Sequence, residues 1–145
     1  MKLIALFPAI LLLAVAAPVE AKTISLKCTS SELRIETGYE HDGTKKDETK
    51  TSNYPPNFLN INLAAMRASV DGSQYTVTAT PEKITLVKGS VGSATMSNPF
   101  KRFIINRNSL KFEEVELAFG GYVGSFRSEA KGSCIKSVVP VGNQI

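Results

Sequence analysis

The chain has 145 residues, carries a formal net charge of +4 and is 43% hydrophobic. This hydrophobic content can fill a core, and the lack of long low-complexity tracts argues against an intrinsically disordered protein. The length that remains after removal of the N-terminal signal described below is that of one ordinary domain. No internal repeat indicates a second domain.

The first 21 residues have the layout of a secretory signal peptide. Lys2 is followed by an apolar run over residues 3–17 and by small residues around Ala21, where a signal peptidase cleaves. The run is shorter than the roughly 20 residues of a membrane-spanning helix, so we expect cleavage and no integral membrane anchor. Residues 22–145 then form a single exported domain, located in the periplasm or secreted.

Two cysteines, Cys28 and Cys134, lie near the two ends of this domain. An even number of cysteines in an exported protein indicates a disulfide bond, and two cysteines allow one intramolecular pairing. Such a bond closes a loop over most of the domain, for which chain entropy predicts a stabilisation of roughly 4–5 kcal/mol.

Apolar and polar residues alternate along most of the domain, in short runs rich in β-branched and aromatic side chains. A period of two is typical of antiparallel strands with one face in the core and the other in water. We therefore expect an all-β fold, a small antiparallel barrel or sandwich of about seven to nine strands. The alternating runs begin at Ile24, Leu33, Leu59, Tyr75, Ile84, Phe103 and Leu110.

Residues 63–70 fit a strand and a short helix equally well. Leu63, Met66 and Val70 have helical spacing, but the segment covers only about two turns and lacks a cap. One short helix therefore stays an alternative here. Residues 38–56 and 89–98 are polar and rich in small residues, which predicts loops.

Turns are predicted where the strands need them. Asp71-Gly72 is a favoured hairpin dipeptide, and residues 80–83 contain a proline suited to a type I turn. Residues 106–109 include two asparagines, which tolerate positive φ. The alternation shifts by one at Glu113–Glu114, and this shift predicts a β-bulge.

Few side chains suggest catalysis. The single histidine, His41, lies near Asp42, Asp47 and Glu48 in a charged stretch that is a poor scaffold for a metal site or a catalytic triad. We expect no metal and no cofactor.

A second candidate group is acidic. Glu114 and Glu116 are two residues apart and so share a strand face, as a carboxylate pair for glycoside cleavage would require. Such pairs usually come from separate elements. We therefore interpret these residues and Glu113 as the solvent-facing side of a strand.

One stretch is distinctly basic. No acidic residue occurs between Glu82 and Glu113, and phenylalanines interleave with the cations in its second half. Outside the cell, anionic phosphates of envelope polymers are better partners for such a stretch than nucleic acid. We expect an anionic-ligand site in which folding gathers Lys101, Arg102, Arg107 and Lys111 around a hairpin over residues 103–112.

Several short motifs carry a family resemblance. They are Leu26-Lys27-Cys28, Tyr75-Thr76-Val77, the Ile-Thr-Leu run at 84–86, the hairpin at 103–110 and Gly132-Ser-Cys134. The chain resembles small exported two-cysteine β proteins of proteobacteria, a set of unknown function. Leu110 stands where those proteins often have a glycine. In outline the chain is also similar to periplasmic lysozyme inhibitors, which are small β-barrels with terminal cysteines, although their Lys-Gly and Ser-Gly-x-x-Tyr signatures are missing.

These observations predict a non-catalytic binding or inhibitory module of the cell envelope, not an enzyme. Its partner is an anionic envelope component or a protein. The alternative is a small hydrolase that uses aspartate or glutamate side chains, which would need a pocket with convergent carboxylates of raised pKa.

Overall fold

The structure is a computed structural model that describes residues 23–38, 43–51, 54–120 and 124–138. It confirms the all-β fold: the described residues form nine antiparallel strands and one short 3-10 turn, η1 (Val91–Ser93), with no α-helix. No helix in the described part of the chain is long and apolar enough to cross a membrane. The strands are β1 (Thr23–Gly38), β2 (Lys45–Thr51), β3 (Asn57–Asn62), β4 (Arg67–Val70), β5 (Ser73–Ala79), β6 (Lys83–Lys88), β7 (Phe100–Asn106), β8 (Lys111–Phe119) and β9 (Ser125–Lys136).

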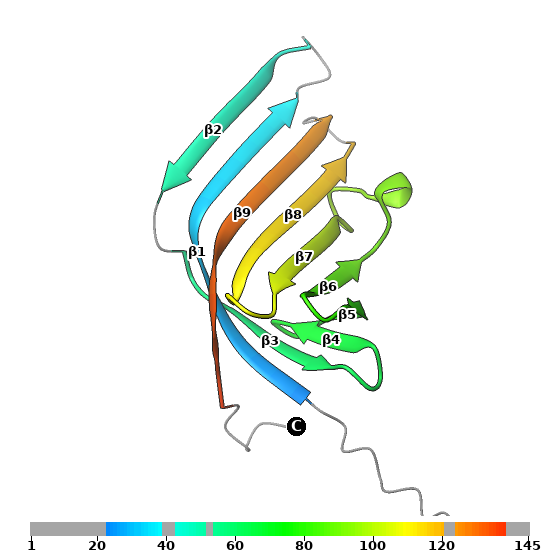
Figure 1. Ribbon diagram of the computed structural model, residues 1–145. Coiled ribbons are helices and arrows are strands. Elements are labelled where there is room, and N and C mark those ends of the chain that lie inside the picture. Colours follow the sequence, from blue (N-terminus) through cyan, green and yellow to red (C-terminus); the bar gives the residue numbers. More distant parts are fainter. Residues whose placement is uncertain (1–22, 39–42, 52–53, 121–123, 139–145) are drawn as a thin grey trace, which may run out of the picture.

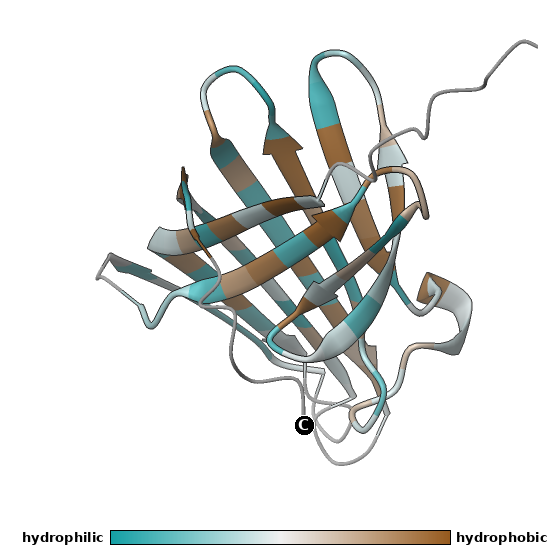
Figure 2. Cartoon of the chain, turned by 90° about the horizontal axis from the view of Figure 1, so that it is seen from below, coloured by the Kyte–Doolittle hydropathy of each residue, from teal (hydrophilic) through white to brown (hydrophobic). Residues whose placement is uncertain are grey.

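Eight of these strands close into a barrel. β1 and β3 to β9 pair in order around it, and pairing between β1 and β9 forms the seam that closes the ring. Along the strands in Figure 2, hydrophobic residues (brown) alternate with hydrophilic ones (teal). This alternation places one set of side chains inside the barrel and the other outside. The sequence left barrel and sandwich open, and the fold is a barrel.

The ninth strand, β2, extends one side of the barrel into a tall wall. The first half of β1 pairs with β3, and its second half pairs with β2 along the same edge. β2, β1, β9 and β8 therefore project beyond the shorter strands (Figure 1). The expected loop over residues 38–56 was partly wrong, because β2 occupies residues 45–51.

A continuous apolar core fills the barrel. The largest fully buried side chains include Phe103 and Phe112, whose ring centroids lie 6.2 Å apart, and Tyr75 meets Phe103 edge to face at 5.9 Å. The rest of the buried cluster comes from the other barrel strands as well, so that all eight contribute: Leu26, Cys28, Leu59, Ile61, Ala68, Val70, Val77, Ile84, Leu86, Ile105 and Cys134 join Tyr75, Phe103 and Phe112.

The structure resolves the ambiguity at residues 63–70 in favour of a strand. Residues 63–66 form the turn that leads into β4, and Met66 takes a left-handed conformation with φ of 51°. The helical alternative was wrong because the turn reverses the chain within four residues, and β4 then pairs with both β3 and β5.

The predicted turns are confirmed. Asp71 and Gly72 have φ of 46° and 83° and join β4 to β5, as a two-residue hairpin turn requires. At the β5–β6 turn the Thr80 amide donates to the Lys83 carbonyl at 2.9 Å. In the β7–β8 turn the left-handed residue is Leu110, with φ of 54°, and not an asparagine.

The β-bulge lies on a different strand from the one predicted. Pairing of β8 with both neighbours runs without a register shift through Glu113 and Glu114, so a bulge at that point was wrong. The register shifts instead between Ser30 and Glu32 of β1, opposite Gly132 of β9. The extra residue at the bulge changes which residues of β1 face inward: Cys28 before the bulge and Leu33 after it both lie on the inward face.

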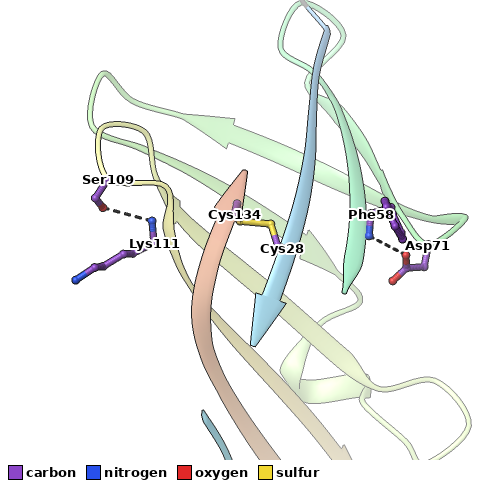
Figure 3. The surroundings of a disulfide bond; sticks show 6 residues. All are labelled: Cys28, Phe58, Asp71, Ser109, Lys111 and Cys134. Carbon is purple, nitrogen blue, oxygen red and sulfur yellow. Dashed lines mark hydrogen bonds between the residues drawn. A yellow bond between two sulfur atoms is a disulfide. The ribbon is translucent and has the colours of Figure 1, made fainter. Parts of the chain in front are cut away.

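The predicted disulfide bond is confirmed. Cys28 and Cys134 stand directly opposite each other on β1 and β9 and are bonded (Figure 3). Both are buried, at 0% and 4% exposure. The bond therefore links β1 covalently to β9, the two strands whose pairing closes the barrel, and it lies within the core.

Candidate functional site

Ionisable side chains gather inside one end of the barrel, where β7 begins next to the wall. We call Tyr75, Lys101, Glu114 and Glu116 the barrel mouth. In β8, Phe112 faces the core, and strand parity places Glu114 and Glu116 on the same inward face. Glu114 pairs across the sheet with two buried residues, Phe103 and Ala130. The interpretation of these glutamates as solvent-facing was therefore wrong.

Burial changes the acidity of Glu114. Loss of solvation around the carboxyl raises the pKa of Glu114 to about 7; nearby Lys101 opposes this, while Glu116 and Asp71 add to it. At neutral pH this carboxyl is thus divided between a protonated form that donates a hydrogen bond and an ionised form that does not.

Glu116 is held differently. Its Oε2 lies 3.1 Å from Nζ of Lys101, the residue directly opposite on β7, and the two side chains are 24% and 29% exposed. This ion pair keeps a charged acceptor two residues from the protonatable carboxyl of Glu114. The mouth therefore holds two carboxyls in unlike environments.

Tyr75 completes the group from β5. The residue is 5% exposed. Burial first, and then the charges of Glu114, Glu116 and Asp71, raise the pKa of its phenol. The hydroxyl therefore stays protonated and can donate a hydrogen bond. Next to the mouth, Lys88 pairs across from Lys101 and its Nζ donates to Ser73 Oγ at 3.3 Å.

The acidity of Glu114 predicts a pH dependence of stability. The folded state binds this proton more tightly than the unfolded chain, because the carboxyl pKa rises from 4.5 to about 7 on folding. The free energy of unfolding should therefore fall as pH rises from about 4.5 to above 7, by at most about 3 kcal/mol. Urea unfolding from about pH 5 to about pH 8 measures this slope.

Two glutamine variants test the assignment. Glu114→Gln should remove most of the slope and should make the protein more stable than wild type at the alkaline end. Glu113→Gln, one residue away on the exposed face, should leave the slope unchanged. Equal slopes in wild type and Glu114→Gln would contradict the assignment.

The structure does not bring the four predicted anion-binding cations together. Lys101 points into the mouth, whereas its neighbour Arg102 is exposed on the outer face. Arg107 is bound to the β5–β6 turn, where its Nη1 donates to the Thr80 carbonyl at 2.9 Å. Lys111 is exposed at the start of β8. Opposite strand faces and the length of the hairpin separate these charges, so the expected single cluster was wrong.

A shallow groove lies on the outer surface beside the β7–β8 turn. Its volume is about 320 Å³. Of the four predicted cations only Lys111 lines it, together with Lys131 of β9. The described residues that line it are Ile104, Asn106, Ser109, Lys111, Phe112, Glu113, Lys131 and Gly132.

The acidic stretch around His41 offers no metal site in the part that the structure describes. His41 and Asp42 lie outside the described residues, and Asp47 and Glu48 are successive residues of β2, so they face opposite sides. Asp47 forms an ion pair with Arg34. Among the described residues no three histidine, cysteine, aspartate or glutamate side chains are grouped closely enough to hold a metal ion.

Sequence reasoning missed Tyr75 and the inward role of Lys101. The signal was present at Glu113–Glu114: after that point the apolar residues of β8 are Val115, Leu117 and Phe119, on the face opposite to Phe112. Without a bulge, such a shift means that the polar residues between them face inward.

Comparison of the chain with protein-family models, with curated proteins and with solved structures gave no match. The resemblance to exported two-cysteine β proteins and to lysozyme inhibitors therefore stays a prediction.

Proposed function

We propose that the protein is an exported, non-catalytic binding module of the cell envelope whose ligand binds at the barrel mouth. Export is supported by the signal-like residues 1–21 and by the Cys28–Cys134 bond, which is consistent with an oxidising compartment. Its setting is the periplasm or the extracellular space.

The observation that carries this proposal is the inward orientation of Lys101, Glu114 and Glu116. A barrel of this size is stabilised by apolar side chains inside, and inward ionisable groups lower that stability. Groups that oppose folding in this way are found mainly at functional sites. The mouth offers donors on Tyr75, Lys101 and protonated Glu114, and an acceptor on Glu116.

The packing of the interior favours binding over catalysis. Phe103 and Phe112, both 1% exposed, fill the barrel below the mouth. A ligand would therefore contact the mouth and the inner face of the wall without entering a deep chamber. Tyr75 and Lys101, which border the two carboxyls, are well suited to orient a polar group there.

A carboxylate-dependent hydrolase is the second candidate. One specific observation favours it: Glu114 has a raised pKa, whereas Glu116 forms an ion pair with Lys101, so the two carboxyls lie in unlike environments, as a general acid and a base or nucleophile do. In this alternative the protein would turn over its ligand, whereas a binding module retains it.

An affinity capture from envelope extract tests the binding proposal. The double variant Lys101→Gln with Glu116→Gln removes the mouth ion pair without changing the net charge. We expect immobilised wild type to retain a component that this variant loses, because the variant lacks both the charged donor and the charged acceptor. Mass spectrometry of the eluates identifies the component.

The matched control removes an ion pair from the outer face. Arg127 and Glu129 form an ion pair on β9, with side chains 51% and 29% exposed, so Arg127→Gln with Glu129→Gln also leaves the net charge unchanged. This control variant should retain the same component as wild type. Equal capture by all three proteins would overturn the proposal, and cleaved products formed by wild type but not by the mouth variant would establish the hydrolase instead.

A further inference from the structure

The groove beside the β7–β8 turn is lined by two lysines and by polar residues of the turn. It lies at the turn end of the hairpin, while the barrel mouth lies near its other end. Lys111 and Glu116 are five residues apart along β8, about 17 Å. The groove is therefore separate from the mouth described above.

Two lysines face the groove from neighbouring strands. In the β8–β9 register Lys111 pairs with Ser133 and Glu113 with Lys131, so the two lysines are diagonal neighbours on one face, about 7 Å apart at Cβ. Figure 3 shows the Lys111 side chain extending away from the barrel. Among the described residues no carboxylate lies within ion-pair distance of Lys111.

The turn adds neutral donors to these cations. Asn106 Oδ1 accepts the backbone amides of Asn108 and Ser109, both at 2.9 Å, which leaves its Nδ2 hydrogens to donate elsewhere. Ser109 Oγ accepts the Lys111 amide at 3.4 Å, which leaves its hydroxyl hydrogen to donate. The same hydrogen bonds that form the turn thus orient two donor groups at the groove.

One carboxylate and an apolar floor complete the groove. Glu113 is 63% exposed, and its Oε1 lies 4.0 Å from Lys131 Nζ, at the outer limit of an ion pair. Such a weak, exposed contact does not neutralise Lys131. Ile104 supplies apolar side-chain surface beneath the charges, and apolar surroundings strengthen hydrogen bonds to an anion.

We propose that this groove binds a phosphate group, with Lys111 and Lys131 as the charged donors and Asn106 and Ser109 as neutral donors. Converging cationic and neutral donors match the several acceptor oxygens of a phosphate, whereas a lone cation would not. The phosphate can come from a soluble phosphate ester or from a lipid headgroup, since both present the same oxygens. This inference does not depend on the ligand of the barrel mouth.

The experiment compares phosphate sources on full-length mature protein. Amide and side-chain NMR shifts are followed during titration with inorganic phosphate and with glycerol phosphate. Binding to phosphatidylcholine vesicles with and without phosphatidylglycerol is measured by co-sedimentation. We expect the phosphate-dependent shifts to centre on Asn106, Ser109, Lys111, Lys131 and Gly132, and to weaken as salt screens the lysines.

Three variants separate the groove from general surface charge. Lys111→Gln with Lys131→Gln should weaken binding about tenfold or more. Lys45→Gln with Lys46→Gln removes the same charge from exposed positions on β2 and should change binding less than about twofold. Glu113→Gln should strengthen binding, because Glu113 is the one carboxylate among the described residues that line the groove, and it repels the phosphate. A gain of affinity cannot come from misfolding.

The soluble phosphates and the vesicles distinguish the two possible sources of the phosphate group. Groove-centred shifts with soluble phosphates but no vesicle binding support the proposal with a soluble ester as ligand, and groove-dependent binding to phosphatidylglycerol supports it with a lipid headgroup. The proposal is overturned if no phosphate source produces shifts in the groove. Equal losses in the groove and β2 variants would also overturn it, since net charge alone would then explain binding.

Discussion

Replacement of Gly132 by alanine should lower the free energy of unfolding by about 3 kcal/mol, because the added Cβ has no space. That atom would lie 2.1 Å from the Thr29 carbonyl oxygen and 2.8 Å from both the Ser30 Cα and the Phe112 ring. Two of these contacts are backbone atoms of β1 at and next to its bulge, and they cannot move aside as a flexible side chain would. Urea unfolding and thermal melting followed by circular dichroism measure the loss.

Gly92 provides the matched control. A Cβ at this position meets nothing within 4 Å, and its backbone is outside the left-handed region. Gly92→Ala should therefore change stability by no more than about 0.5 kcal/mol. If Gly132→Ala were as stable as Gly92→Ala, the close approach of β1 and β9 at the bulge would not be a feature of the protein in solution.

Loss of the disulfide bond should have the largest effect on stability. The bond closes a loop of 106 residues, and chain entropy gives roughly 4–5 kcal/mol for a loop of this length. The variant Cys28→Ala with Cys134→Ala removes the bond without leaving polar groups in the buried seam. Its urea midpoint should shift accordingly, since the unfolded chain regains the freedom that the bond removes.

Reduction supplies the internal control for this variant. A thiol reductant should move the urea midpoint of wild type close to that of the alanine variant and should leave the variant unchanged. Because both sulfurs are buried, reduction should be slow until the barrel opens. If the reductant lowered the stability of both proteins equally, its effect would not come from the disulfide bond, and the prediction would be contradicted.

Most barrel strands could be predicted from sequence because their side chains alternate. The run from Tyr75 to Ala79 and the turn at Asp71-Gly72 each have one strong local preference, and the fold agrees with it. β2 could not be found in this way. Its residues are Lys-Lys-Asp-Glu-Thr-Lys-Thr, without an apolar face, and only pairing with β1 makes them a strand.

The functional residues were harder to predict, for two different reasons. Alternation shows that Glu114 and Glu116 share a face but does not say which face, and that depends on β7 and β9 packing around them. The separation of Lys101 from Arg102 follows from the sequence alone, because consecutive residues of a strand point to opposite sides. Only Lys111 of that set has Lys131 beside it, and their proximity depends on a pairing between distant segments that no local pattern encodes.

The seam between β1 and β9 also fixes the order of events during folding. The first strand finds its barrel partner only when the last strand exists, and the pairing continues to the end, where the Ser137 amide donates to the Ser25 carbonyl at 2.9 Å. Until then β1 and β8 each present an unpaired edge that can join another chain. Contacts between such distant segments fold slowly. A chain that is still being synthesised, or that has lost its final strand, is therefore an aggregation-prone open sheet and not a smaller barrel.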